Sequence, residues 1–467
     1  MTDLSIPRRQ FLRASALGLG GLALKAGCGS GPPGKKIPNY IFLLIDDQRW
    51  DALGCAGNLI IQTPHMDRLA EEGMRFSRAF VTTPICAASR ASIFTGLYER
   101  THGYTFTKPP IRREFTDISY PVLLRRAGYR TGFIGKFGVK VEDGVMEEMF
   151  DSSQVSDQKY FHEIDGQRRH LTDIHGDRAV EFLRGCNPDE PFCLSLSFWA
   201  AHAVDEDPLQ YFWPEACDDL YVYDDIPVPD TADPAFFDAL PDFLKASMNR
   251  IRWHWRFDTP EKFQSMVKGY YRMVSGIDRV IGRLREELSR LNRDRDTIII
   301  LMSDNGYFLG ERGFAGKWLM HDLSILVPLI IYDPRMPSER RGSVLDHMVL
   351  NIDIAPTLLA MAGIDVPKAM QGRSLAPLIM GQADGWRQEV ICEHLWDHPE
   401  IPQTECLRTD RWKYIRYWKH PEYEELYDLH NDPHEAENLA GNPAHADLLM
   451  DLRRRCARRF EMLRQTG

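Results

Sequence analysis

Residues 40–45 read YIFLLI and lead directly into Asp46 and Asp47. An uninterrupted apolar run of this length is typical of a strand that is buried on both faces of a parallel sheet. Ligands of open α/β sheets bind beyond the carboxyl ends of the strands, so the two acids stand where a ligand site is expected. This stretch therefore predicts both a fold class and the place of a functional site.

Three further apolar runs of the same kind follow along the chain. They cover residues 131–134, 192–198 and 297–302, and they end near Lys136, His202 and Asp304–Asn305, respectively. Between the last two, apolar residues recur every three or four positions over residues 273–288, which predicts an amphipathic helix. Strands that alternate with helices predict an α/β fold with a mostly parallel central sheet covered on both sides.

The last part of the chain has a different pattern. Residues 406–417 and 425–429 are rich in β-forming residues and read as a hairpin, and a charged helix is expected over about 443–465. We therefore expect a catalytic domain over residues 37–375 and a smaller C-terminal α+β subdomain over residues 376–467.

Composition excludes some classes of protein. The 467 residues carry a formal net charge of −10, which argues against a nucleic-acid partner. An anionic substrate would need a locally cationic pocket, so Arg and Lys within the motifs matter more than the net charge. The nine cysteines show no Cys-x-x-Cys spacing, which disfavours a zinc ribbon or a redox motif.

Residues 1–36 read as an export signal with its linker. Residues 5–12, SIPRRQFL, are similar to a twin-arginine signal, and a short apolar run follows at 14–26. Residues 26–30, AGCGS, are similar to a lipoprotein cleavage site, although Lys25 stands where that pattern has an aliphatic residue. We expect a periplasmic or cell-surface protein, and a lipid on Cys28 is the only membrane link that the sequence suggests.

The strand ends offer ligands for a metal ion. Asp46, Asp47, Asp304 and Asn305 are hard oxygen donors, which suit calcium or magnesium rather than zinc. Asp46 and Asp47 alone would more often be a solvated turn or a helix cap. The second group at the other strand end favours the metal site.

Cys86 opens the run CAASRASIFTG at residues 86–96. The run resembles the signature of the formylglycine-dependent sulfatases, Cys-x-Pro-Ser-Arg, with Ala88 in the place of Pro. Without this context Cys86 would be read as a small buried hydrophobe. The resemblance continues through most of the chain, at 46–48, 63–70, 135–136, 303–306, 316–318, 353–358 and 426–429.

The resemblance implies the fold and the chemistry of the site. The family has an alkaline-phosphatase-like α/β/α sandwich with a smaller C-terminal subdomain, and it uses one calcium ion. A formylglycine-generating maturation enzyme oxidises the cysteine to 3-oxoalanine, whose hydrate attacks sulfur and also touches the metal. By this resemblance Cys86 is the nucleophile precursor and a metal ligand, Arg90 holds the hydrate, and Lys136 and Lys317 contact the hydrate and the sulfate.

Two histidines complete the expected site. His202 matches the residue that protonates the leaving oxygen. Family members often carry a second histidine two residues after the lysine that matches Lys136, but Gly138 stands there in this chain. His321, close after Lys317, is a candidate for the missing role, although it could equally contact the substrate or the solvent.

The expected substrate is a sulfated carbohydrate or an aryl sulfate. Residues 205–260 are acidic and aromatic, and the aromatic rings at 213, 221, 223, 253 and 255 could stack on sugars or simply pack within an insertion. Two alternatives stay open. One is a phosphonate or phosphate ester hydrolase of the same superfamily, and the other is a lipoprotein that binds sulfated glycans without cleaving them.

Overall fold

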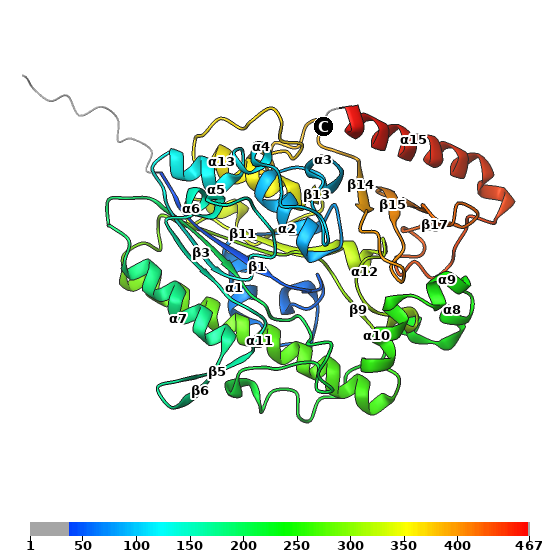
Figure 1. Ribbon diagram of the computed structural model, residues 1–467, viewed down its shortest axis with the longest axis horizontal. Coiled ribbons are helices and arrows are strands. Elements are labelled where there is room, and N and C mark those ends of the chain that lie inside the picture. Colours follow the sequence, from blue (N-terminus) through cyan, green and yellow to red (C-terminus); the bar gives the residue numbers. More distant parts are fainter. Residues whose placement is uncertain (1–36, 466–467) are drawn as a thin grey trace, which may run out of the picture. The chain divides into compact units, whose positions relative to one another are not determined.

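The computed structural model describes residues 37–465; the expected export signal, including Cys28, lies outside the described residues. A nine-stranded sheet forms the centre of this part of the chain, in the order β12-β2-β11-β8-β1-β7-β3-β4, and β13 pairs with β2 (Figure 1). Its strands are β1 (Asn39–Ile45), β2 (Met74–Phe80), β3 (Arg130–Gly135), β4 (Ser152–Val155), β7 (Phe192–Ser197), β8 (Thr297–Ser303), β11 (Leu326–Tyr332), β12 (Ser343–Leu345) and β13 (Val349–Leu350).

The expected parallel core of the sheet is confirmed. β1 runs parallel to both β7 and β8, and β3 runs parallel to β7 and β4. β11 is antiparallel to its neighbours β8 and β2. In the register of the central strands, Ile45 pairs with Ser303 and Leu44 with Ser197, so the carboxyl ends of β1, β8 and β7 meet at one edge.

Helices cover both faces of the sheet, as the alternating pattern predicted. Tyr40, Phe42 and Leu44 of β1 belong to one buried cluster, and the intervening Ile41, Leu43 and Ile45 belong to another. The first cluster includes α2 (Cys86–Thr95), α5 (Tyr120–Arg126) and α13 (Ile354–Met361). The second includes α1 (Pro64–Glu72), α7 (Leu171–Arg184) and α11 (Pro260–Arg290), which lie on the opposite side of the sheet (Figure 1). The fold is an α/β/α sandwich.

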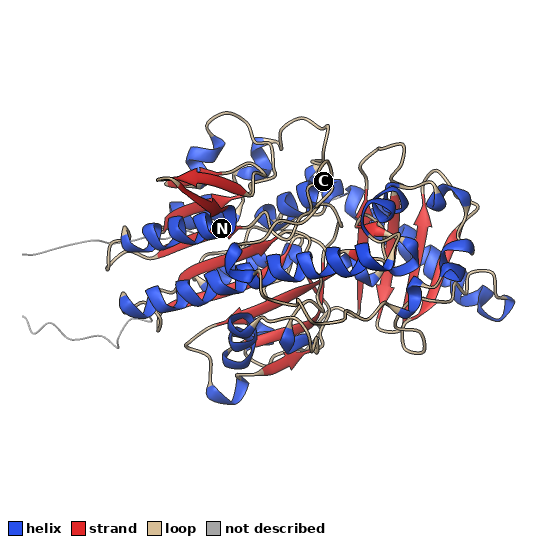
Figure 2. Cartoon of the chain, turned by 90° about the horizontal axis from the view of Figure 1, so that it is seen from below, coloured by secondary structure: helices blue, strands red, loops and turns tan. Residues whose placement is uncertain are grey.

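A separate antiparallel sheet follows in the C-terminal part. Its strands are β14 (Glu389–His394), β15 (Thr404–Thr409), β16 (Trp412–Tyr417) and β17 (Glu424–Asp428), in that order, and Figure 2 shows them as a distinct group. α15 (Ala446–Gln465) packs against β15 and β16. The stretches predicted as a hairpin, 406–417 and 425–429, therefore form three strands, β15, β16 and β17, of a four-stranded sheet, and β14 was not predicted.

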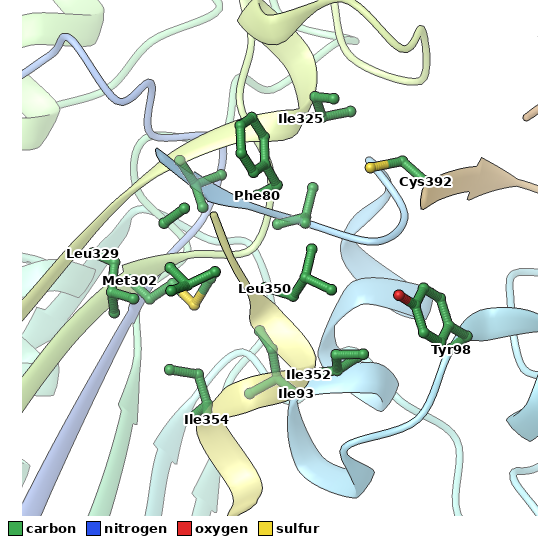
Figure 3. Packing of buried hydrophobic residues seen from close by; sticks show 14 of the residues in the cluster. Phe80, Ile93, Tyr98, Met302, Ile325, Leu329, Leu350, Ile352, Ile354 and Cys392 are labelled. Carbon is green, nitrogen blue, oxygen red and sulfur yellow. The ribbon is translucent and has the colours of Figure 1, made fainter. Parts of the chain in front are cut away.

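The two sheets share one hydrophobic core. The cluster that contains Phe80 of β2 and Leu350 of β13 also contains Cys392 of β14 and Leu407 of β15. Figure 3 shows Cys392 facing the side chains around Phe80 and Leu350. Since apolar burial is continuous across residue 375, the predicted boundary between the two domains stays a prediction.

Shorter elements fill the connections. α10 (Met248–Arg256) lies against the two-residue strand β10 (Ala315–Gly316). The others are α3 (Glu99–His102), α4 (Arg113–Thr116), α6 (Val145–Met149), α8 (Pro234–Asp238), α9 (Asp242–Lys245), α12 (Asp322–Ile325), α14 (Ala376–Ile379), and the hairpins β5 (Phe161–Ile164)–β6 (Gln167–His170) and β9 (Phe308–Leu309)–β10. Across residues 37–465, every helix is too short or too polar to span a membrane.

Candidate active site

The acids that the sequence predicted at two strand ends do lie together. Asp46, Asp47, Asp304 and Asn305 are each at most 1% exposed. The backbone N–H of Asp47 donates to Asp304 Oδ1 at 3.3 Å, and Asn305 Nδ2 donates to Asp47 Oδ1 at 2.6 Å. Asp47 has φ = 58°, a left-handed conformation that turns the chain sharply after β1. The adjacent ends of two parallel strands thus gather four oxygen-bearing side chains.

Three cations surround these acids. Lys136 Nζ contacts Asp46 Oδ2, and Lys317 Nζ contacts Asp47 Oδ1. Arg90 Nε donates to Asp304 Oδ2 at 2.8 Å, and its Nη1 donates to the carbonyl oxygen of Lys136 at 2.6 Å. We call these seven residues the strand-end cluster: Asp46, Asp47, Asp304, Asn305, Arg90, Lys136 and Lys317.

The strand-end cluster contains acceptors without donors. Asp46 Oδ1, Asp47 Oδ2 and Asn305 Oδ1 are buried and have no hydrogen-bond partner within residues 37–465. One ligand atom each from Asp46, Asp47 and His202 lie within 4.8 Å of one another. Buried oxygens without partners are costly, and several hard oxygens in one place fit a calcium or magnesium ion. The donor set therefore fits the metal that the sequence predicted.

The electrostatics of the acids point the same way. Burial raises the pKa of Asp46, but Lys136, His202, Lys317 and Arg90 together hold it below its usual value. Burial and the neighbouring Asp46 raise the pKa of Asp304 to about 6, although Arg90 opposes the rise. A dication among these oxygens would stabilise all the carboxylates in their charged form.

Cys86 lies beside this cluster. It is the first residue of α2, follows the extended Ile85 and is 5% exposed. Arg90 is four residues further along the helix, so the two side chains lie on the same face one turn apart. Cys86 lines a pocket of about 480 Å³ together with Lys317 and His202. The structure thus brings Cys86, Arg90, Lys317 and His202 to one place, as the sequence predicted.

His202 stands at the edge of the strand-end cluster. Its Nδ1 lies 2.6 Å from the carbonyl oxygen of Ala203 and 3.1 Å from Gln158 Nε2, so this nitrogen is engaged by the protein. Its Nε2 lies 3.8 Å from Asp47 Oδ2. Burial lowers the pKa of His202 to about 4, although Asp47 and Asp46 oppose the decrease. His202 is therefore placed to exchange a proton at Nε2.

His321 lies in a different buried cluster. Its Nε2 is 3.5 Å from Glu425 Oε2 and 3.4 Å from the Tyr427 hydroxyl. Burial, followed by Arg312 and Lys413, holds its pKa well below the usual value. His321 does not line the pocket of Cys86. The structure therefore does not bring His321 together with the other predicted catalytic residues, because the chain turns towards the C-terminal sheet after Lys317.

The structure also explains the departure at Gly138. A Cβ at this position would lie 2.8 Å from Arg90 Cδ, and the residue has φ = 72°. The buried Arg90 side chain passes through the space that a side chain at 138 would occupy. A histidine at this position would therefore require Arg90 to move.

The remaining pocket wall comes largely from two segments, the β14–β15 loop and residues 205–260. Trp396, His398 and Ile401 reach the pocket from the loop between β14 and β15. Residues 205–260 also contribute: of the five aromatic residues that could either stack on sugars or pack within an insertion, Trp255 alone lines the pocket, beside Asp205, Glu206, Met248 and Arg252. No sequence pattern marks the β14–β15 loop, since its contribution depends on how the second sheet packs.

A second pocket of about 480 Å³ lies elsewhere, lined by Arg49, Ile226, Tyr271, Glu311 and Glu435 among others. It includes neither Cys86 nor any member of the strand-end cluster. The carboxylate of Glu311 is engaged there by Arg49 and by the backbone N–H of Leu309. Chemistry therefore assigns the candidate active site to the pocket that contains Cys86.

Known proteins resemble this chain over most of its length. An N-acetylglucosamine-6-O-sulfatase from Bacteroides thetaiotaomicron is 28% identical, with 88% of this chain and 84% of that protein aligned. An arylsulfatase from Clostridium perfringens is also 28% identical, over 89% of this chain and 93% of that protein. A solved structure of a protein in complex with its substrate D-glucosamine-2-N,6-O-disulfate superposes with a TM-score of 0.81 at 25% identity, covering 92% of this chain and 99% of that one.

The family assignment rests on more than half of the chain. Residues 310–461 match the family described as N-sulphoglucosamine sulphohydrolase, C-terminal. Residues 38–364, which hold every residue of the strand-end cluster as well as Cys86 and His202, match the sulfatase family. The chain belongs to the sulfatase family of sulfuric ester hydrolases.

Proposed function

We propose that this enzyme hydrolyses sulfate monoesters of carbohydrates, with an aldehyde made from Cys86 and one bound calcium ion. The observation that carries the proposal is the strand-end cluster, in which three unpartnered oxygens and three cations lie beside Cys86. The names of the relatives, an N-acetylglucosamine-6-O-sulfatase and a protein bound to a glucosamine disulfate, support a sugar as the substrate.

Asp46, Asp47, Asp304, Asn305 and the modified Cys86 would hold the calcium ion. The ion would draw negative charge from the sulfate group, and the hydrated aldehyde would supply a nucleophilic hydroxyl. The modification itself requires a formylglycine-generating enzyme as a partner during synthesis.

The chain's own residues bind and orient the sulfate. Lys136 and Lys317 place buried ammonium groups beside the acids, where they can donate to sulfate oxygens in a site of low dielectric. Arg90 is held by Asp304 and by the Lys136 carbonyl, so its guanidinium is fixed before substrate arrives. His202 is the proposed donor to the leaving sugar oxygen, and the negative charge of bound sulfate would favour its protonated form.

Intact-mass analysis of the Cys86 peptide tests the first step. Protein from a host with the maturation enzyme should give a peptide about 18 Da lighter than the unmodified one, since a carbonyl oxygen replaces the thiol. An unmodified thiol in protein that releases sulfate would refute the role of the aldehyde.

Turnover of matched substrates tests the reaction. The enzyme should release sulfate from sulfated sugars and from nitrophenyl sulfate faster than it cleaves the corresponding phosphate and phosphonate esters. Cys86→Ala should abolish turnover, whereas Cys55→Ala, outside the pocket, should leave it intact. A preference for phosphorus esters would overturn the sulfatase assignment for the substrate. Binding of sulfated sugars without any turnover, with the aldehyde confirmed, would favour the non-catalytic alternative.

Export is part of the same proposal. The twin-arginine pattern in residues 5–12 supports a periplasmic or cell-surface location. The separate AGCGS run at residues 26–30 supports a lipid on Cys28. Replacing Arg8 and Arg9 with lysine should leave the protein in the cytoplasmic fraction, and unchanged fractionation would contradict export by this route.

A further inference from the structure

One wall of the Cys86 pocket rests on two arginines that share one carboxylate. Asp205 forms ion pairs with both Arg252 and Arg256. Arg252 is 9% exposed and Arg256 is fully buried. Burial raises the pKa of Asp205, but the two guanidinium groups hold it below its usual value overall, so the carboxylate is charged. Two buried cations share one anion, which leaves one positive charge without a buried partner.

The pocket's other acid does not balance this charge. Glu206 also lines the pocket, but it is exposed, and the structure gives it no ion pair in the described part of the chain. An exposed carboxylate is screened by water and compensates a buried charge poorly. An uncompensated buried cation is costly, so its presence in a pocket wall points to an anionic ligand.

The side chains of this wall include buried hydrogen-bond donors that lack acceptors. Arg252 Nε, Trp318 Nε1 and Trp396 Nε1 are buried and unpartnered among residues 37–465, and all three residues line the pocket. A buried N–H group usually has an acceptor in the native or the ligand-bound state. Three donors with no acceptor call for a group that only accepts hydrogen bonds.

Two of these donors, on Arg252 and Trp318, lie close to Lys317, the proposed sulfate-binding lysine. The Arg252 guanidinium lies over the Trp318 ring, 4.6 Å from its centroid, and Trp318 directly follows Lys317. Asn249, on the same helix as Arg252, donates to the carbonyl oxygen of Lys317 at 2.9 Å. α10 is therefore fixed to the segment that carries the proposed sulfate-binding lysine, Lys317. Arg252 of this helix packs on Trp318, the next residue after that lysine.

We propose that Arg252, assisted by the indole N–H groups of Trp318 and Trp396, binds a second sulfate group of a multiply sulfated sugar. The inference rests on the proposed sulfatase function and adds to it the class of preferred substrate. A sulfate offers acceptor oxygens to these three N–H donors and a negative charge to the arginine pair, which shares a single carboxylate. A sugar with a hydroxyl or an acetamide in that position would leave the charge of the arginine pair unbalanced.

The test compares two substrates that differ at one position, N-acetylglucosamine 6-O-sulfate and glucosamine 2-N,6-O-disulfate. The wild-type enzyme should have the higher kcat/KM for the disulfate. Arg252→Gln should lower the ratio of the two kcat/KM values by about tenfold to a hundredfold, the range of a hydrogen bond to a charged group. Arg252→Lys should keep part of the preference because it keeps the charge.

Arg250→Gln is the matched control. Arg250 lies on the same helix, stacks on Phe237 and Trp253 and does not line the pocket, so the substrate ratio should stay as in the wild type. Arg252→Gln should also fold, because Asp205 keeps its ion pair with Arg256. An equal loss on both substrates, or a wild-type preference for the monosulfated sugar, would overturn the proposal.

Binding separates this inference from the proposed function. With Cys86→Ala protein, calorimetry should give a lower Kd for the disulfate than for the monosulfate, and adding Arg252→Gln should remove most of the difference. If wild-type enzyme turned over neither sugar but this difference were present, the proposed reaction would fail while the second-sulfate site stood. If turnover occurred and the two sugars bound equally, the second-sulfate site would fail alone.

Discussion

Two clusters of buried charges in this molecule look alike in composition and differ in how their acceptors are satisfied. The second, which we call the C-terminal cluster, contains Asp322, Lys413, Glu435 and Arg408. Asp322 Oδ1 is 2.5 Å from Lys413 Nζ and Oδ2 is 3.1 Å from Arg408 Nη2. Glu435 Oε1 is 2.5 Å from Lys413 Nζ, and Oε2 accepts from the backbone N–H of Asp322 at 2.7 Å.

The strand-end cluster, by contrast, leaves Asp46 Oδ1, Asp47 Oδ2 and Asn305 Oδ1 without donors among the described residues. Burial and charge are common to both clusters, so neither property identifies an active site. The distance to a cation distinguishes them: Glu435 Oε1 also lacks a hydrogen-bond partner but lies 2.5 Å from Lys413 Nζ, whereas Asp46 Oδ1 and Asp47 Oδ2 lie 3.8 Å from Lys317 Nζ and His202 Nε2, respectively. A structural ion-pair network engages its own groups closely, whereas a binding site leaves groups for its ligand. The C-terminal cluster joins α12 to the second sheet, and the strand-end cluster is the one that fits the proposed ion and substrate.

The largest expected effect is on catalysis, from Lys317→Met. Removing one preorganised donor that stabilises developing charge typically lowers kcat about a hundredfold to a thousandfold. We expect a loss of that size on nitrophenyl sulfate, measured in saturating calcium, with the melting temperature showing that the variant is folded. Lys413→Met tests the other cluster and should act through stability instead. A similar loss of kcat per folded molecule for both variants would erase the distinction between the clusters.

The next effect is on stability, from Asp322→Ala. The variant leaves Lys413 with Glu435 alone and Arg408 without its carboxylate. We expect the free energy of unfolding to fall by about 3 kcal/mol, the lower end for a broken buried pair, since the Asp322 side chain is 17% exposed. Denaturant titration measures the change. A loss below about 1 kcal/mol, the level of an exposed pair, would contradict the structural role.

Calcium should affect only one of the clusters. An ion that binds the folded state stabilises it by about 2.7 kcal/mol when its free concentration is a hundred times Kd. We expect calcium to raise the melting temperature of the wild type and of Asp322→Asn, but not of Asp47→Asn. Chelator-treated protein provides the baseline. An undiminished calcium response in Asp47→Asn would place the metal elsewhere.

The smallest expected effect concerns His321. Its contacts with Glu425 and Tyr427 place it with the C-terminal sheet, so His321→Gln should change kcat per folded molecule by less than about threefold, or roughly 0.7 kcal/mol. His202→Gln is the comparison and should lose the benefit of a general acid, about a hundredfold or more. A hundredfold loss in His321→Gln would restore the catalytic role that the sequence suggested for it.

Much of the fold could be predicted from local sequence patterns. The runs at 40–45, 192–198 and 297–302 became β1, β7 and β8, because continuous apolar segments can only be buried between two helical layers. The antiparallel strand β11 and its neighbour β2 could not be assigned in this way. Their direction depends on long-range pairing, which leaves no periodicity in the strand itself.

The residues of the candidate site also fall into those that local sequence patterns predict and those that only long-range packing brings together. Asp46, Asp47, Asp304 and Asn305 could be found because they follow recognisable strands, and Cys86 because it opens a distinctive run. Arg252, Trp318 and Trp396 could not be recognised as one wall, since they come from α10, the segment after β10 and the β14–β15 loop. Only packing brings these three segments together.

By itself, the sequence determined the sandwich with its parallel core, the sheet edge that holds the candidate site, and the cysteine and charged residues for which we propose catalytic roles. These follow from periodicity and from the geometry of parallel strands, which act over a few residues. The tertiary structure decided that His321 contacts Glu425 and Tyr427 of the C-terminal sheet, that Arg90 occupies the space beside Gly138, and that two buried arginines share one carboxylate in the pocket wall. Each of these depends on which distant segments share a buried volume, and burial determines whether a polar group needs a partner.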